Sequence, residues 1–386
     1  MPTRNSKVLI SGAGVAGPTL AFFLDRAGFE VTVVERAEKA RSSGAPVDVR
    51  GVALPVVKEM GVYADLRAAR IQRSSLALLD SHGRTRARID TAAFDLARGD
   101  DELELPRAEL ANILAEPTRG SVEYVMGDTV TSLADDGRGV DVTFERGRPR
   151  RFDLVAGADG LHSRVRRLAF GADTDFVRPL GMYFATIPFE GTLEHAGELV
   201  LFNAPNRLAS IHPVKGSPMV AFIFRTDATP GDDPRRFVAE QFAGDGWRIP
   251  ELLATLRRTE HFYFDGVCQV RVPKWSRGRV ALLGDAASCV SIFGEGSSMA
   301  LAGGACLGKA LTQAGTSPEA AFAAYEREHR PRVERFQRGM GLGSRLVVPK
   351  TRLGIEARAL AARISPLVTS FERWRHRSQP AAAIKA

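Results

Sequence analysis

The chain has 386 residues, of which 44% are hydrophobic and 25% charged, and this composition is typical of a globular protein with one large or two intimately joined domains. No run of 18 or more apolar residues occurs, which excludes a membrane-spanning helix. A strand is expected from Lys7 with no secretory segment before it, so we expect a cytoplasmic protein.

The formal net charge of +8 raises the possibility of nucleic-acid binding. The basic residues are scattered among 45 acidic residues, however, and no nucleic-acid-binding motif interleaves them with aromatic residues. We therefore expect the charge to attract anionic cofactors rather than nucleic acid. The three cysteines are odd in number and lack metal-ligand spacing, so we expect neither a metal site nor a disulfide framework.

The first predicted elements are a strand, a glycine-rich turn and a helix. Lys7–Ser11 is a short apolar run typical of a buried parallel strand, and Val15–Gly28 has apolar residues at helical spacing. Between them, Gly12 permits a tight turn, Gly14 lets a pyrophosphate approach the backbone, and Gly17 lets helix and strand pack closely. With Ala16 in the first turn of the helix, this segment predicts a dinucleotide site at a helix N-terminus.

A second strand, Glu30–Glu35, follows that helix and ends in an acid 18 residues beyond Gly17. This is the offset expected for a carboxylate that accepts hydrogen bonds from a ribose, so Glu35 is predicted to bind the cofactor. Arg36 beside it could lie over the adenine or could be an ordinary solvated arginine.

Two further glycine-rich segments occur far along the chain, Gly157-Ala158-Asp159-Gly160 and Gly284-Asp285-Ala286-Ala287. Nucleotide signatures near both ends, with different material between them, imply that a cofactor domain is interrupted by a second domain. We expect the cofactor domain in residues 1–73, 104–178 and 273–345, and the substrate domain in residues 179–272. Residues 74–103 are expected to form a hairpin that joins the substrate domain, and residues 346–386 a C-terminal helix.

The sequence between the glycine-rich motifs predicts a β-sheet. Ser75–Asp80 and Arg84–Ile89 are separated by a short turn and are typical of a hairpin, and the chain from about Gly181 to Val272 is strand-rich, which predicts an antiparallel sheet with one face free to cover a ligand. After the third glycine segment, helices are expected at 296–310 and 318–337, and a further helical segment at 354–375 that Pro366 breaks or kinks.

The full pattern, from about Lys7 to Gln337, resembles the class A flavoprotein aromatic hydroxylases, the FAD monooxygenases typified by para-hydroxybenzoate hydroxylase and by the tetracycline-inactivating monooxygenases. The resemblance rests on Gly12-x-Gly14-x-x-Gly17 with Glu35, on Gly157-Ala158-Asp159-Gly160-Leu161-His162-Ser163-Arg164-Val165-Arg166, and on the run from Gly278 to Ala287. It implies an α/β fold with a Rossmann-like (GR2-type) FAD-binding domain, interrupted by a mainly antiparallel β-sheet substrate domain, plus a C-terminal helix.

The resemblance also implies roles for individual residues. Asp285 should accept hydrogen bonds from the ribityl hydroxyls of FAD. Asp159 and Gly160 belong to an element associated with both FAD and pyridine nucleotide, and Arg164 could reach a phosphate or pair with Asp159. The other implied flavin contacts are Gly44 in a loop beside the isoalloxazine, Arg107, and Gly296 with Ser297 at the start of a helix. Unlike many relatives, the chain has no proline before Gly294-Glu295-Gly296, so Ile292 or Phe293 could line the site instead.

The implied reaction is that NAD(P)H, as NADPH or NADH, reduces FAD, O₂ adds at flavin C4a, and the resulting hydroperoxide gives one oxygen atom to an aromatic or polycyclic, polyketide-like substrate. His212 is the histidine that we nominate as a base for a phenol, although a histidine there is more often structural. Candidate substrate-contacting residues are Phe184, His212, Phe222, Phe224 and Phe293.

Two other functions are compatible with part of this sequence pattern. An FAD-dependent halogenase or reductase would use the same cofactor, but the segment Gly246-Trp247-Arg248-Ile249-Pro250 has one tryptophan where tryptophan-type halogenases have two. A flavin- or ligand-binding protein without turnover is the third possibility. The sequence does not decide the oligomeric state, monomer or dimer.

Overall fold

The computed structural model describes residues 6–39, 46–90, 102–193, 195, 197–214, 218–289, 295–313 and 317–362. The chain folds into two compact units. The first comprises Met1–Ile71, Leu103–Met182 and Asp265–Gly343, and the second comprises Gln72–Glu102, Tyr183–Phe264 and Ser344–Ala386. Segments of the second unit thus interrupt the first along the sequence, and this α/β organisation confirms the predicted fold class.

A six-stranded sheet lies at the centre of the first unit, in the order β17-β18-β11-β1-β2-β7. Five strands run parallel and β17 pairs antiparallel at one edge. Their bounds are β1 (Lys7–Ser11), β2 (Glu30–Glu35), β7 (Glu123–Met126), β11 (Leu154–Gly157), β17 (Ser276–Arg277) and β18 (Val280–Leu282). The interior strands are almost continuously apolar because both faces of a parallel sheet are buried.

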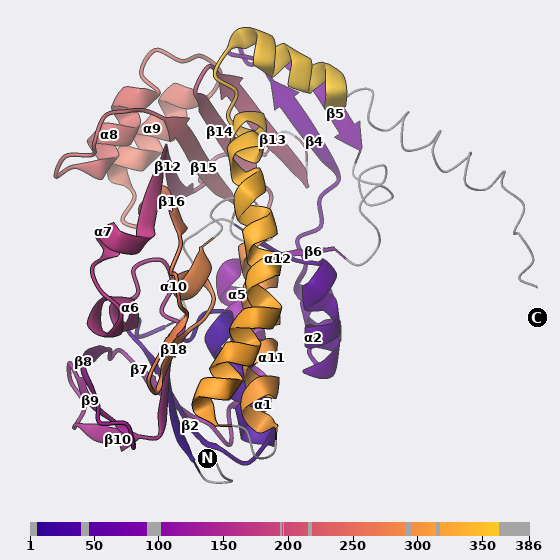
Figure 1. The fold of residues 1–386 in the computed structure, drawn as a ribbon. Coiled ribbons are helices and arrows are strands. Elements are labelled where there is room, and N and C mark those ends of the chain that lie inside the picture. The colour runs from indigo at the N-terminus through magenta and orange to yellow at the C-terminus, as the bar shows by residue number, and fades with distance from the viewer. Residues whose placement is uncertain are drawn as a thin grey trace, which may run out of the picture. The chain divides into compact units, whose positions relative to one another are not determined.

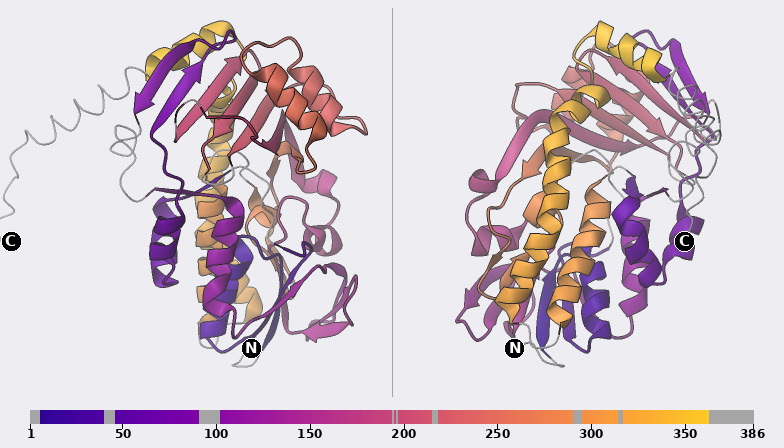
Figure 2. Two further views of the ribbon diagram at one scale, coloured as in Figure 1. Left: turned by 180° about the vertical axis from the view of Figure 1, so that it is seen from behind. Right: turned by 45° about the vertical axis from the view of Figure 1, so that its right-hand side comes forward.

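Helices of the first unit pack closely where a glycine, which has no side chain, lies at the contact between them. A Cβ at Gly308 of α11 would lie 2.5 Å from the Cβ of Phe23 on α1, which requires a glycine there. Figures 1 and 2 show α1 and α11 side by side. The helices are α1 (Ala16–Arg26), η1 (Gly51–Ala53), α2 (Leu54–Glu59), α3 (Tyr63–Ala69), α5 (Arg107–Ala115), η2 (Glu116–Thr118), α6 (Arg164–Ala169), α7 (Asp173–Phe176), α10 (Asp285–Ser288), α11 (Gly296–Thr312) and α12 (Pro318–Val347).

Two small antiparallel sheets complete the first unit. One has the order β10-β9-β8, and the other pairs β3 with β6. Their bounds are β3 (Val47–Val49), β6 (Leu103–Leu105), β8 (Val130–Asp135), β9 (Val140–Phe144) and β10 (Arg150–Phe152).

A seven-stranded sheet characterises the second unit, in the order β16-β12-β15-β14-β13-β4-β5. The predicted hairpin forms, as β4 and β5, and it joins this sheet because β4 pairs parallel with β13. Strands β13, β14 and β15 pair antiparallel. The bounds are β4 (Ser75–Leu79), β5 (Thr85–Asp90), β12 (Val177–Pro188), β13 (Glu198–Ala204), β14 (Arg207–His212), β15 (Met219–Arg225) and β16 (Tyr263–Val270).

Two helices that the sequence analysis did not predict lie within the strand-rich region, α8 (Pro234–Gln241) and α9 (Ile249–Arg258). Their apolar residues form one core with a face of the sheet. Helix starts were nevertheless present in the sequence, because Asp233 caps α8 before a proline and Pro250 stands in the first turn of α9. Residues 352–362 are helical, as expected for part of 354–375, and the rest of that segment lies outside the described residues.

No helix among the described residues is long and apolar enough to cross a membrane.

Candidate functional site

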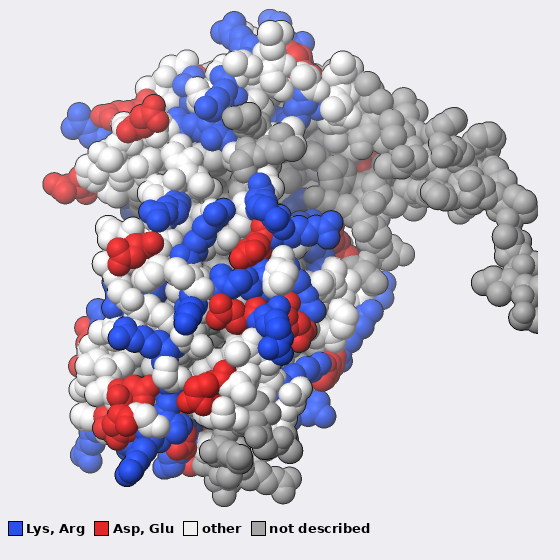
Figure 3. Space-filling view, viewed as in Figure 1, with Lys and Arg blue, Asp and Glu red and all other residues white. Residues whose placement is uncertain are grey.

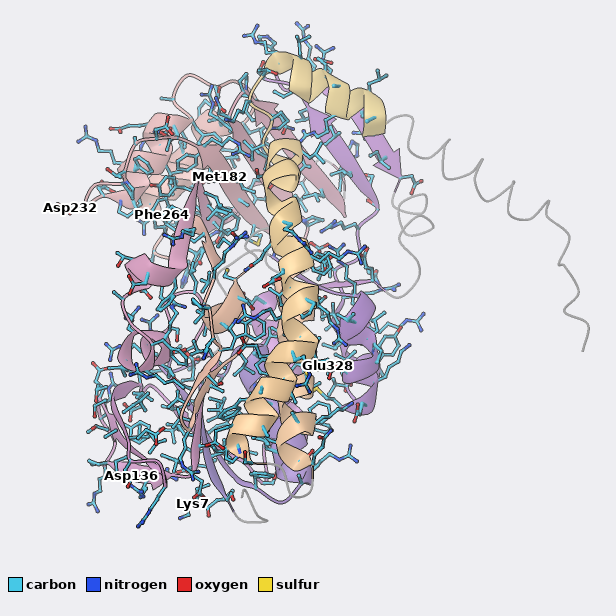
Figure 4. All side chains as sticks on the ribbon, in the orientation of Figure 1. Lys7, Asp136, Met182, Asp232, Phe264 and Glu328 are labelled. Carbon is cyan, nitrogen blue, oxygen red and sulfur yellow. The ribbon has the colours of Figure 1, made fainter. Side chains whose placement is uncertain are left out.

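The three glycine-rich segments meet at one edge of the parallel sheet. Each follows or ends a strand, β1, β11 or β18, and these strands are neighbours. Lys7, labelled in Figure 4, marks the amino end of β1, so the glycines lie at the opposite, carboxyl edge. The carboxyl ends of strands in an open α/β sheet are where ligands bind.

Backbone hydrogen bonds hold the three segments together. The N–H of Ala158 donates to the carbonyl of Ser11 at 2.7 Å, and the N–H of Leu283 donates to the carbonyl of Gly157 at 2.9 Å. Gly12, with φ of +113°, passes so close to the second segment that a Cβ would lie 2.4 Å from the Ala158 carbonyl oxygen. The sequence motifs are therefore one structural site.

In the first segment, Gly17 is needed for close packing, whereas Gly14 has open space beside it. A Cβ at Gly17 would lie 1.9 Å from the carbonyl oxygen of Gly12, so the helix can leave the strand here only with glycine. At Gly14, in contrast, a Cβ would have no heavy atom within 4 Å. The space beside Gly14 lies just before Ala16, the first residue of α1, where free N–H groups favour an anion.

Glu35 ends β2 next to this turn. One of its carboxylate oxygens accepts the N–H of Ala13 at 3.0 Å, and the other accepts the N–H of Ala37 at 2.9 Å. A carboxylate has about four acceptor positions, so Glu35 keeps capacity for ribose hydroxyls. Arg36 is exposed, and the structure does not decide between its two predicted roles.

Asp159 organises the second segment. Its carboxylate accepts the backbone N–H groups of Arg164 at 2.8 Å and Val165 at 3.1 Å, and it also accepts the hydroxyl of Ser163. Removal from water raises the pKa of Asp159, and these hydrogen bonds oppose that shift. The contact with Arg164 is thus made by its backbone, and Asp159, followed by Gly160 at φ of +79°, shapes the loop. Direct contact of either residue with a cofactor stays a prediction.

A buried arginine connects the second and third segments. The guanidinium of Arg166 donates to the carbonyl of Leu161 at 2.6 Å and to the carbonyl of Ala286 at 3.0 Å. It also pairs with Asp173 at 2.6 Å, and its side chain is fully buried. The sequence analysis gave Arg166 no role, although it belongs to the extended second motif, because these partners are set by tertiary packing.

Asp285 stands at the start of α10 in the third segment. The residue keeps some accessible surface, but enough protein surrounds the carboxyl group to raise its pKa. The cationic side chain of Arg107, at the start of α5, acts in the opposite direction. A carboxyl group in such surroundings is stabilised when hydroxyl groups donate to it.

The start of α11 is fastened to β3. Ser297 donates to the carbonyl of Asp48 at 2.5 Å, and Ser298 accepts the N–H of Arg50 at 3.1 Å. Arg50 and Glu295 form an ion pair of 2.5 Å that is largely buried, which the sequence analysis also missed. Gly296 is the first residue of this 17-residue helix.

The predicted substrate residues in the second unit divide between two faces of its sheet. Phe222 and Phe224 are fully buried against α8 and α9, with Phe222 and Phe242 rings 5.0 Å apart. Ala185, the neighbour of Phe184 on β12, belongs to that same core. Because successive side chains of a strand point to opposite faces, Phe184 lies on the other face of the sheet. The three phenylalanines therefore cannot line one wall, and Phe222 and Phe224 have a core role instead.

His212 lies on the same face as Ser210, and their Nε2 and Oγ atoms are 3.0 Å apart. Desolvation lowers the pKa of His212 to about 3, with a smaller contribution from Arg73. The imidazole is therefore neutral near pH 7 and a weak base, which favours a structural role. Contact of His212 or Phe184 with substrate stays a prediction.

Three predicted residues, Gly44, Ile292 and Phe293, lie outside the described residues. In the part of the chain that the structure describes, no group of three or more His, Cys, Asp or Glu residues could hold a metal ion.

The arrangement fits a dinucleotide. It offers an open position for phosphates beside Gly14, a carboxylate at Glu35 for a ribose, and a partly desolvated carboxyl group at Asp285 for further hydroxyls. Arg107 adds a positive charge near Asp285.

Comparisons with known proteins agree with this geometry. A family model described as an FAD binding domain matches residues 5–339. A flavin-dependent monooxygenase of Legionella longbeachae is 32% identical over 332 residues, covering 84% of this chain and 85% of that protein. The uncharacterized protein Rv1260 of Mycobacterium tuberculosis is 37% identical over 340 residues, covering 86% and 91%.

Solved structures share the fold over nearly the whole chain. The crystal structure of tetracycline destructase Tet(51) is 32% identical, with a TM-score of 0.82 and coverage of 95% of this chain and 98% of that one. The structure of Klebsiella pneumoniae HpxO complexed with FAD and uric acid has a TM-score of 0.74 and covers 97% of each chain, and at 23% identity it shows the fold alone.

Proposed function

Because this chain belongs to the class A flavin-dependent monooxygenases, we propose that it is a single-component enzyme that uses FAD, NAD(P)H and O₂ to hydroxylate or epoxidise an aromatic or polycyclic small molecule. The observation that carries the proposal is the convergence of the three glycine-rich segments around an open phosphate position and a partly desolvated carboxyl group. A cytoplasmic location is part of the proposal.

Bound FAD supplies the redox chemistry, by taking two electrons from NAD(P)H and activating O₂ so that one oxygen atom enters the substrate and the other leaves as water. The protein's part is to bind and orient. Gly14 and the N-terminus of α1 hold the pyrophosphate, Glu35 a ribose, and Asp285 the ribityl hydroxyls. Arg107 holds a neighbouring part of the flavin, and the first turn of α11, at Gly296 and Ser297, directs N–H groups toward it.

The substrate class rests on the relatives. Tet(51) and Tet(55), at 32% and 30% identity, are tetracycline destructases by name, so their substrate is polycyclic. In the second unit of this chain, Phe184 and Tyr263 present neighbouring rings 6.1 Å apart, which suits a planar ligand. Of the three predicted phenylalanines in the second unit, Phe184 is the one that we retain as a substrate contact.

The test is oxygen transfer under ¹⁸O₂. Purified, FAD-loaded protein is supplied with NADPH or NADH and a panel of phenolic and polycyclic compounds, and products are followed by mass spectrometry. We expect one compound to accelerate NAD(P)H oxidation and to gain a single ¹⁸O atom. NAD(P)H oxidation that yields only hydrogen peroxide with every compound would count against this panel as substrates and favour a reductase.

The same assay separates the alternatives. A chlorinated product that forms only when chloride is present would identify a halogenase. Tight ligand binding without any NAD(P)H oxidation would identify a binding protein. The matched control is Leu168→Ala, a residue of α6 that is 42% exposed and has no role in the proposed site, and it should leave the rate unchanged.

A further inference from the structure

A groove in the first unit takes no part in the site described above, although α10 borders both. It lies between the second half of α12 and residues 270–275 at the end of β16, and Ala287 and Ser288 of α10 also line it. All of its lining residues belong to the first unit. The groove has a volume of about 370 Å³, which falls in the range of small-molecule sites.

Buried apolar side chains and hydrogen bonds to the backbone give the groove a fixed wall. Val270, Val272 and Val333 are at most 2% exposed. Gln337 of α12 donates to the carbonyl of Val270 at 2.8 Å, and Arg330 of the same helix donates to the carbonyl of Val272 at 3.1 Å. Because α12 holds the segment after β16 in this way, the wall is already formed before a ligand binds.

Three arginines and one glutamate are the charged residues that line the groove. Arg330 is engaged by acids of its own helix, since its guanidinium pairs with Glu326 at 2.6 Å and lies 3.8 Å from Glu334. Arg271 and Arg338 are exposed, and neither forms an ion pair with a residue that the structure describes. Figure 3 shows Lys and Arg side chains gathered, with acidic side chains between them, over the part of this face where Figure 1 draws α12.

Arg271 is held in place at one end of its guanidinium group. Its Nε donates to the side-chain oxygen of Gln269 at 2.7 Å, and Gln269, which is 6% exposed, donates in turn to the carbonyl of Gln337 at 3.1 Å. Within the described ranges, the two terminal nitrogens of Arg271 have no hydrogen-bond partner. A guanidinium group that is oriented through Nε in this way presents its remaining N–H groups to an anion.

We propose that this groove binds the phosphate group of a small organic ligand. Arg271 and Arg338 donate to the phosphate oxygens, and the carbon skeleton of the ligand lies against Val270, Val272 and Val333. Two sources share this chemistry, a pyridine nucleotide and a free phosphate compound, and the experiment below distinguishes them. The site does not depend on the reaction proposed above, because the binding is tested without turnover.

The placement of the charges selects a phosphate group over other anions. Arg271 follows β16 and Arg338 lies on α12, so the two guanidinium groups come from different walls. A phosphate group offers three acceptor oxygens in different directions, whereas a carboxylate offers two in one plane. A nucleic acid would bring an extended row of negative charges past Glu334, which is 52% exposed.

The test is calorimetric titration of the full-length, FAD-loaded protein with inorganic pyrophosphate and, separately, with NADP⁺. Bound FAD keeps both probes out of the dinucleotide site, and NADP⁺ cannot reduce the flavin. We expect pyrophosphate to bind the wild type, and to bind more weakly at high salt. Arg271→Gln with Arg338→Gln should weaken this binding about 100-fold, from about tenfold for each arginine that no longer donates to a charged oxygen. Arg271→Lys with Arg338→Lys keeps both charges and should lose less.

The second probe identifies the source of the phosphate. If the ligand is a pyridine nucleotide, the glutamine variant weakens the binding of NADP⁺ as well as that of pyrophosphate. If the ligand is a free phosphate compound, the variant weakens the binding of pyrophosphate and leaves that of NADP⁺ unchanged. Either result supports the groove as a phosphate site.

Controls separate the groove from the total charge and from the fold. Arg67→Gln with Arg70→Gln removes two positive charges at the end of α3, where both residues are exposed, and this variant should bind pyrophosphate like the wild type. The Arg271 and Arg338 variants should keep the flavin spectrum and the thermal unfolding midpoint of the wild type. A wild type that does not bind pyrophosphate, wild-type binding by the glutamine variant of the groove, or an equal loss in the α3 variant overturns the proposal.

Discussion

Replacement of Gly14 and Gly17 by alanine should separate cofactor binding from folding within one turn. A Cβ at Gly14 meets no heavy atom within 4 Å, so the apo-protein should tolerate Gly14→Ala, with a stability change between zero and a gain of about 1 kcal/mol. A Cβ at Gly17 would lie 1.9 Å from the Gly12 carbonyl oxygen. Backbone must move to relieve that contact, so Gly17→Ala should cost about 1–3 kcal/mol or more in the apo-protein.

For FAD binding, in contrast to stability, Gly14→Ala should be the more damaging of the two substitutions. If the open position at Gly14 holds the pyrophosphate, its new methyl group removes a charge-assisted hydrogen bond worth about 1.5–3 kcal/mol, which weakens FAD binding about 10- to 150-fold. Urea unfolding of the apo-protein gives the first quantity, and titration of flavin fluorescence gives the second. Wild-type FAD affinity in Gly14→Ala, or wild-type stability in Gly17→Ala, would refute the assignment of these two glycines.

Three other variants test the rest of the site and the second unit. The pKa of Asp285 is raised above its ordinary value of 3.8, so at pH values above 3.8 ionisation of this carboxyl group lowers the stability of the apo-protein. Asp285→Asn should therefore stabilise the apo-protein at pH 7, as measured by unfolding, and should weaken FAD binding, as measured by titration. Arg166→Met leaves Asp173 and two carbonyls without their buried donor and should cost about 3–5 kcal/mol in urea unfolding; a loss below about 1 kcal/mol would contradict that role. Since the pKa of His212 is lowered to about 3, its contribution to stability is complete above about pH 6.5 and is lost as the pH falls toward 3, by at most about 1.4 kcal/mol per pH unit, and His212→Gln should reduce this loss. A catalytic base at His212 would instead show as a changed pH profile of hydroxylation in that variant.

The local parts of the fold could be predicted because short-range rules determine them. The turn at Gly12, the strand that ends at Glu35 and the hairpin formed by β4 and β5 each depend on residues close together in the chain. The α/β class was implied by the family resemblance that the three motifs carry. Their meeting at one sheet edge follows from the parallel order β18-β11-β1.

The parts that sequence could not supply depend on packing between distant segments. Alternation along β15 shows that Phe222 and Phe224 share a face, but not that α8 and α9 cover that face. The partners of Arg166 come from two different loops, and the Arg50–Glu295 pair joins residues far apart in the chain. Such contacts follow only from the tertiary structure.

The measurement that tests the central claim most directly is the visible spectrum of the purified protein, after reconstitution with FAD, during anaerobic titration with NADPH in the presence and absence of phenolic and polycyclic ligands. We predict a bound-flavin spectrum that NADPH bleaches, and bleaching that becomes faster with one ligand class. A bound flavin that never bleaches with NADPH or NADH would contradict the single-component reaction, and no flavin spectrum after reconstitution would contradict the assignment of the site.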